Sequence, residues 1–202
     1  MSVTGFWIIG VVSTSDIEQL HAALPVQPPE SEDLAWWQAM DEAALAEPEE
    51  RGFGRHGATG AVQRFADGMA ARRPDLDQDA CMELLAALTD EDRFVASIRK
   101  GDPAAALYYG LGFEASYALP GRSGCFLLTA GDVVTAAPVF DRTLTMDAGR
   151  RARVLDRVRA WLEVEGDPGS DFDVDALIDG PRRIVRRALE QGRGAFGTVC
   201  WY

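Results

Sequence analysis

Residues that carry catalytic chemistry or positive charge are scarce in this sequence. It has one lysine, Lys100, no asparagine, two histidines and three cysteines, and its formal net charge is −12. General affinity for nucleic acids depends on positive charge that displaces counterions from the phosphates. We therefore expect no nucleic acid among the partners of this protein.

The three cysteines, Cys81, Cys125 and Cys200, are isolated in apolar surroundings and form no Cys-x-x-Cys pair. Structural zinc sites and redox dithiols depend on such pairs. We predict buried free thiols in a reducing compartment, with no metal site and no cofactor.

Long apolar runs are also missing from the sequence. No stretch approaches the roughly 20 residues that a membrane-spanning helix needs. The N-terminus lacks the basic start and the apolar run of a signal peptide. We therefore predict a cytoplasmic protein without a membrane partner.

Candidate catalytic groups are few. No Ser/His/Asp or Cys/His set emerges from the sequence, so no catalytic residue is predicted. Helical spacing places His21 beside the apolar residues Ile17 and Leu20, where it is either a boundary histidine or a ligand or base. No second histidine or cysteine accompanies it, which favours the boundary histidine.

The composition is typical of a soluble globular protein, because 47% of the 202 residues are apolar and 26% are charged. A chain of this length fits a single domain over residues 1–202. We predict one elaboration of that domain, acidic and glycine-rich, at residues 25–60.

The two ends of the chain are its most strand-like segments. Residues 4–12 read TGFWIIGVV and residues 195–202 read AFGTVCWY. Both segments are rich in strand-forming residues and are too apolar to be left in water. We predict an α+β fold in which a small central mixed sheet contains both terminal strands and several amphipathic helices cover it.

A helix is predicted before the last strand. Asp179-Gly180-Pro181 is expected to open it, and Gly192 and Gly194 are expected to end it. Its predicted faces are an apolar side with Ile184, Val185, Ala188 and Leu189, and an opposite side with Arg182, Arg183, Arg186 and Arg187. The arginines form either a solvated face or a site for phosphate or an acidic partner.

The remaining elements are predicted from apolar periodicity and from capping residues. Ser15 and Glu18 have the spacing of a capping box. Further helices are predicted at 61–72, at 76–88, at 148–164, through Phe94, Val95 and Ile98, and from a cap of Thr129 with Asp132 to Pro138.

The stretch from Glu30 to Glu50 holds eight acidic residues and no basic one. It contains Trp36 and Trp37, in a helix predicted over residues 33–47. This helix either covers the core or forms a protein-binding surface. Residues 1–141 carry 22 acidic and 9 basic groups, so the acidic field belongs to this part of the chain.

Residues 51–60, RGFGRHGATG, are rich in glycine and contain a Gly-x-Gly-x-x-Gly pattern. The dinucleotide-binding fingerprint requires a strand before this pattern, and here an acidic helix and Pro48 precede it. We therefore predict a flexible loop, in which Arg55 and His56 are candidate contacts for a ligand or partner.

Two segments resemble parts of the acetyl-CoA-dependent N-acetyltransferases. Arg51-Gly52-Phe53-Gly54 resembles their Arg-x-x-Gly-x-Gly pyrophosphate loop, and residues 106–113, ALYYGLGF, resemble their Ala-x-x-Leu-Tyr-x-x-x-Gly-Phe segment. The resemblance implies that residues 51–57 cradle a pyrophosphate and that Tyr108 or Tyr109 acts as an acid. The predicted helices before and after these segments depart from the family, which has antiparallel strands there.

The order of elements is similar to that of the YfbM-like family of uncharacterised small bacterial proteins. The similar segments are the opening strand and capped helix up to Leu24, the strand that enters a capped helix at 126–133, and the closing helix, turn and strand from Arg187 to Trp201. The acidic stretch at 25–60 departs from the family. The resemblance implies a fold and supplies no catalytic residue.

Two functional hypotheses follow from the sequence. The first is a protein-binding module, regulatory or neutralising in the manner of an immunity protein, whose acidic face engages a basic protein partner. Candidate contacts are Trp36, Trp37, Arg55, His56, Tyr108 and Tyr109. The second is an acyl-CoA-dependent transferase, and the shortage of catalytic groups favours the first.

Overall fold

The structure, a computed structural model, describes residues 3–22, 65–71, 73, 76–121, 123–165 and 172–202. Four strands of the described chain form one sheet in the order β2-β1-β4-β3. They are β1 (Thr4–Val12), β2 (Arg93–Arg99), β3 (Phe126–Leu128) and β4 (Gly194–Trp201). The strands from the two ends of the chain are the two inner strands of the sheet, which confirms the predicted α+β fold.

Every pairing between these strands is antiparallel, although the sequence analysis predicted a mixed sheet. The terminal strands pair directly, with Thr4 and Tyr202 exchanging backbone hydrogen bonds of 2.6 and 3.0 Å. Because β1 has a neighbour on each side, its backbone polar groups are satisfied within the sheet. Trp7, Ile8 and Ile9 are all buried, so both faces of β1 are covered.

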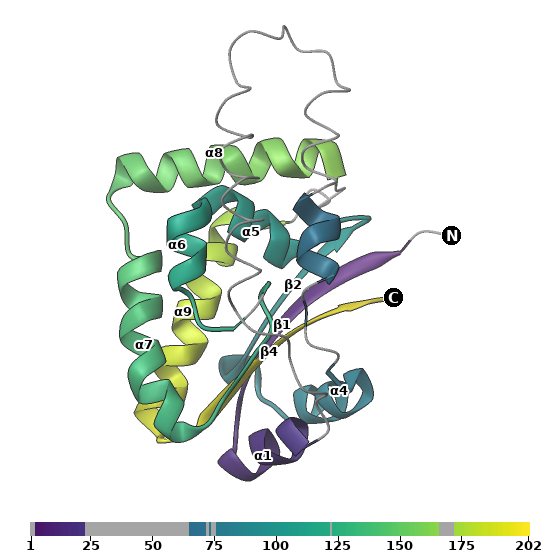
Figure 1. Ribbon diagram of the computed structural model, residues 1–202, viewed down its shortest axis with the longest axis vertical. Helices are drawn as coiled ribbons and strands as arrows, with labels where there is room; N and C mark the ends of the chain where they lie inside the picture. Colours follow the sequence, from purple (N-terminus) through teal and green to yellow (C-terminus); the bar gives the residue numbers. More distant parts are fainter. Residues whose placement is uncertain (1–2, 23–64, 72, 74–75, 122, 166–171) are drawn as a thin grey trace, which may run out of the picture.

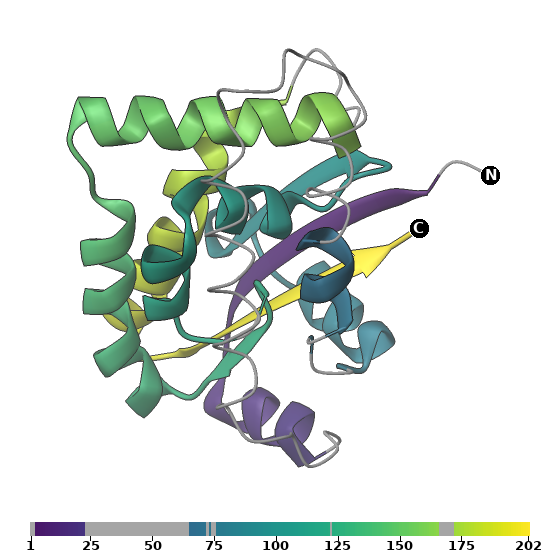
Figure 2. The same ribbon diagram turned by 45° about the horizontal axis from the view of Figure 1, so that its top comes forward.

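Helices cover both faces of the sheet (Figures 1 and 2). They are α1 (Thr14–Ala22), a helix at 65–71, α4 (Gln78–Ala86), the 3-10 turn η1 (Asp90–Asp92), α5 (Pro103–Leu111), α6 (Phe113–Ala118), α7 (Ala130–Leu144), α8 (Ala148–Glu165) and α9 (Val174–Gln191). One face lies against α5, α7 and α9, and the other lies against α1 and α4. The helix predicted at 148–164 is confirmed as α8, and its apolar residues Val154, Val158 and Trp161 are buried.

The segment predicted as a short helix through Phe94, Val95 and Ile98 is a strand, β2, and that prediction was wrong. Phe94, Ala96 and Ile98 are buried, whereas Val95 and Ser97 are exposed. This alternation has the period of two that belongs to a strand.

Two predicted helix boundaries were wrong because an internal proline was taken for a boundary. Helix α7 continues through Pro138 to Leu144, and α9 begins at Val174 and continues through Pro181. In α7 the carbonyl that loses its N–H partner belongs to Val134, on the outer side of the helix. Val134, four residues before Pro138, is 58% exposed.

Helix caps follow the side chains that can accept backbone N–H groups. Thr129 and Asp132 form the predicted capping box at the start of α7. At α1 the reciprocal bonds join Ser13 and Asp16 instead of the predicted Ser15 and Glu18. The cap therefore lies two residues earlier in the chain.

Candidate functional site

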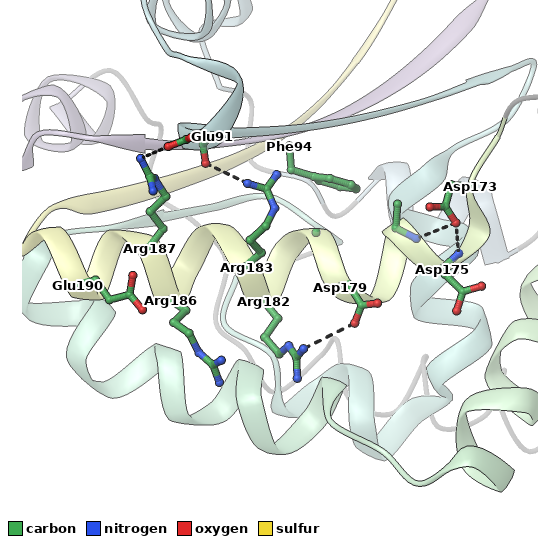
Figure 3. A pocket seen from close by; sticks show the side chains of 12 residues that line it. Glu91, Phe94, Asp173, Asp175, Asp179, Arg182, Arg183, Arg186, Arg187 and Glu190 are labelled. Atoms are coloured by element: carbon green, nitrogen blue, oxygen red, sulfur yellow. Dashed lines mark hydrogen bonds and ion pairs between the residues drawn. The ribbon is translucent and has the colours of Figure 1, made fainter.

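A hollow of about 700 Å³ lies between the outer face of α9 and the start of β2 (Figure 3). Its charged lining consists of Glu91, Asp173, Asp175, Asp179, Arg182, Arg183, Arg186, Arg187 and Glu190. Its apolar lining is limited to Phe94, Ala176 and the small Gly180. The hollow is therefore a polar surface in which both signs of charge lie side by side.

Local sequence explains why α9 passes so close to β2. A Cβ atom at Gly180 would lie 2.2 Å from Cδ2 of Phe94, so only glycine permits this approach. Asp173 begins the helix by accepting hydrogen bonds from the backbone N–H groups of Asp175 and Ala176. Gly192 ends it in the left-handed conformation, with φ of 62°, as the sequence predicted.

Two arginines of α9 close one end of the hollow. Arg183 donates to the backbone carbonyls of Glu91 and Arg93, each at 2.9 Å. Arg187 donates to the carboxylates of Asp92 at 2.5 Å and of Glu91 at 2.9 Å. The bond from Arg187 holds the pKa of Asp92 below its usual value.

The other two arginines of the row reach in the opposite direction, toward α7 (Figure 3). Arg182 donates to the hydroxyl of Thr145 at 2.8 Å, and Arg186 donates to Asp141 at 2.7 Å. The four arginines thus fasten α9 to its neighbours on both sides. Each guanidinium of the row therefore has a protein partner, and Arg186 is at the same time 52% exposed.

The acidic end of the hollow is held by α8. Arg151 donates to Asp175 at 2.6 Å and to Asp179 at 2.7 Å. Hydrogen bonds to Asp179 and Asp175 raise the pKa of Arg151. Asp175 and Asp179 remain 48% and 49% exposed, so their outer lone pairs are accessible to a partner.

The outer edge of β2 runs beside this hollow. Gly5, Trp7 and Ile9 of β1 lie opposite Ile98, Ala96 and Phe94. Because Thr4 bonds to β4, the odd-numbered residues of β1 bond to β2. Val95 and Ser97 therefore direct their N–H and C=O groups away from β1, and within the described residues these groups have no hydrogen-bond partner.

The candidate contacts predicted from the sequence do not come together at this hollow. Trp36, Trp37, Arg55 and His56 lie outside the described residues. Tyr108 is buried in α5, and burial raises the pKa of its hydroxyl. The neighbouring Tyr109 is only half-buried. Tyr109 contacts Phe65 edge-on at 5.6 Å and carries the Arg157 guanidinium 5.0 Å above its ring.

Cys81, Cys125 and Cys200 are free and buried, as predicted. Burial raises the pKa of Cys81 to about 12 and that of Cys125 to about 11, and it also raises the pKa of Cys200. Thiols with such pKa values are protonated and weakly nucleophilic near neutral pH. Within the described residues, no group of three or more His, Cys, Asp or Glu side chains could hold a metal ion.

Sequence reasoning missed the hollow because its parts come from distant segments. Glu91 and Arg187 are 96 positions apart, and their pairing follows from tertiary packing. One local signal was available: apolar residues alternate with others through Phe94, Ala96 and Ile98, which indicates a half-exposed strand.

No family model, curated protein or solved structure matches the chain. Among the described helices, none is both long enough and apolar enough to span a membrane.

Proposed function

We propose that this protein binds another protein through the hollow between α9 and β2. The observation that carries the proposal is the lining, in which four arginines and five acidic residues surround a small apolar floor. Pockets for small molecules are mostly apolar and carry only a few polar groups, whereas this lining is mostly charged. Arginine is enriched at protein interfaces, and opposite charges side by side give an interface its orientation.

The partner proposed is a basic protein. The net charge of −12 favours association with positively charged surfaces. Asp175 and Asp179 are bonded to Arg151 but remain about half-exposed, so they still present carboxylate oxygens in the hollow. A module of this kind suits a regulatory or neutralising role, in which binding covers the active surface of the partner.

Charge reversal in the hollow tests the proposal. Glu190 is exposed and lines the hollow, and Glu163 is also an exposed glutamate, on α8 and outside the lining. We expect Glu190→Arg to weaken the capture of a partner from a lysate of the source cells, and Glu163→Arg to leave capture unchanged. Melting curves of both variants check that the fold is retained.

A third set of variants distinguishes binding at the hollow from binding at the acidic stretch of the sequence. Charge reversals between Glu30 and Glu50 that abolish capture, combined with an unaffected Glu190→Arg variant, would assign the partner to that stretch. Capture that none of these variants changes would contradict binding by charge complementarity.

A further inference from the structure

We propose that the partner is bound as an added β-strand, in which a basic, extended segment pairs antiparallel with the open edge of β2. This inference rests on the proposed function and names its mode of recognition. Strand addition to an exposed sheet edge draws affinity from backbone hydrogen bonds and specificity from alternate side chains.

The first observation is the edge itself. Val95 and Ser97 present outward N–H and C=O groups that have no partner within the described residues. At Arg93, the outward carbonyl is already occupied by Arg183. The free part of the edge therefore begins at Val95, and Arg183 limits an added strand at that end.

The second observation is the helix that flanks the edge. Helix α9 and the segment from η1 into β2 run side by side in opposite chain directions. The contacts that show this join Arg187 to Glu91, Arg183 to Arg93, and Gly180 to Phe94. Continuing that order brings the first turns of α9, with their aspartates, alongside the free part of the edge. The edge of β2 and the first turns of α9 therefore flank the place that an added strand would take.

The chemistry of this place specifies the occupant. Asp173, Asp175 and Asp179 line the side toward α9, so they favour basic side chains there. On the opposite face of the sheet lie Arg93, Val95 and Arg99, which share one side of β2. Val95 is 45% exposed there. A basic side chain is disfavoured beside Val95 and an apolar one is favoured, so the segment alternates basic and apolar residues.

A second copy of this chain is a poorer occupant. Two chains with a net charge of −12 each repel one another, whereas a basic segment is attracted. The place beside the edge of β2 thus fits a basic segment of a different protein better than a self-associated sheet.

The test uses a synthetic ten-residue peptide of alternating lysine and valine, fluorescein-labelled, titrated with the full chain. Controls are a peptide of the same composition in two blocks and a peptide of alternating glutamate and valine. We expect the alternating lysine peptide to bind at least about tenfold more tightly than either control. Equal affinity for all three peptides, or no binding up to about 1 mM, would overturn the assigned chemistry.

N-methylated peptides test the strand pairing directly. In an antiparallel pair, residues directly opposite have their side chains on the same face, and those opposite Val95 and Ser97 direct their N–H groups to β2. We expect methylation of every valine nitrogen to weaken binding at least about tenfold, and methylation of every lysine nitrogen to change it less than about threefold. Equal sensitivity of the two sets would overturn strand addition.

Variants of the protein complete the test. Proline is tolerated at outward-facing positions of edge strands, so Ser97→Pro should fold and lose binding of the peptide. If Ser97→Pro unfolds, the methylated peptides decide alone. Glu190→Arg could abolish capture from the lysate while the two sets of methylated peptides bind equally well. This outcome would support the proposed function and contradict strand addition. Dimers of the free chain that dissociate on peptide binding would overturn the basic segment in favour of a second copy.

Discussion

The two edges of the sheet differ in length and in cover. At one edge, β3 has only three residues, and its Phe126 and Leu128 are buried. At the other edge, β2 has seven residues, and its Val95 and Ser97 are exposed. Natural sheets protect their edges against unwanted pairing, so a long edge that no described residue covers is a candidate place for pairing.

The contacts around β3 show what a closed edge requires. Phe126 packs edge-on against Phe140 of α7, with ring centroids 5.7 Å apart. Gly124 lies just before β3, and its carbonyl accepts a hydrogen bond from the indole N–H of Trp7 in β1 at 2.9 Å. The carbonyl of Ser123 accepts a bond from Arg73 at 3.2 Å, and the same guanidinium is paired with the buried Asp102. The loop before β3 is therefore fastened by buried polar bonds, whereas among the described residues the outward backbone groups of Val95 and Ser97 in β2 have no such bond.

The largest expected effect comes from truncating β4, an inner strand that lies between the two edges of the sheet. Deletion of Thr198–Tyr202 removes the pairing partners of Gly5 to Ile8 and several buried side chains. Each such side chain contributes roughly 1.5–3 kcal/mol, and total stabilities are about 5–15 kcal/mol. We expect an unfolded or insoluble chain. A truncated chain that stays soluble and melts cooperatively would show that the second half of β4 is dispensable for the fold.

Matched lysine substitutions at the two edges sharpen the comparison. Leu128 of β3 is 8% exposed, so Leu128→Lys should lower the free energy of unfolding by about 3 kcal/mol or more. Ser97 of β2 is exposed, so Ser97→Lys should change it by less than about 0.5 kcal/mol. Urea unfolding measures both values, and similar losses at the two positions would show that β2 is also covered.

The buried thiols give a pH dependence that surface groups do not. Folding raises the pKa of Cys81 to about 12 and of Cys125 to about 11, compared with about 8.5 in an unfolded chain. Above pH 8.5 the unfolded chain loses protons that the folded chain keeps, so the free energy of unfolding should fall by about 1.4 kcal/mol per pH unit and per thiol.

Urea unfolding between pH 8 and pH 10, in the native chain and in Cys81→Ala, checks this dependence. The slope should be smaller in Cys81→Ala, because one of the thiols that titrate in the unfolded chain is missing. A slope that is the same in both proteins would show that Cys81 does not contribute.

The smallest expected effect concerns the ion pair at the closed end of the hollow. Because Arg187 lowers the pKa of Asp92, this carboxylate stabilises the fold above its unfolded pKa of about 3.9, and the stabilisation is lost as the pH falls through the folded pKa. Asp92→Asn should therefore lower the melting temperature slightly at pH 7, and the difference from the native chain should disappear as the pH falls through the folded pKa of Asp92. A difference that persists in acid would show that packing causes it.

The sequence predicted the parts of this fold that depend on local patterns. The terminal strands, the cap at Thr129 and the helix α8 follow from apolar periodicity and from capping chemistry, and the structure confirms them. It did not predict β2, because seven residues are too few to distinguish a strand from a short helix on apolar content alone. The start of α9 was misplaced because Pro181 also fits the first turn of a helix.

The hollow could not have been predicted from one sequence. It depends on the contact between Gly180 and the ring of Phe94, which exists only when α9 and β2 are packed together. It also depends on ion pairs between segments that are far apart in the chain, such as that of Arg187 with Asp92. The charge composition leads to the hypothesis of a basic partner, and the surface proposed for it depends on the tertiary structure.

Residue-resolved amide hydrogen exchange of the free protein tests most directly whether β2 offers an open edge. Along β2, the account predicts that the N–H groups of Val95 and Ser97 exchange at least about 100-fold faster than those of Phe94, Ala96 and Ile98, which bond to β1. The slow class should also include the amides of β1, which has a neighbour on each side. Equal and strong protection of Val95 and Ser97 in the free protein would show that the edge is already covered, and would contradict a site for an added strand.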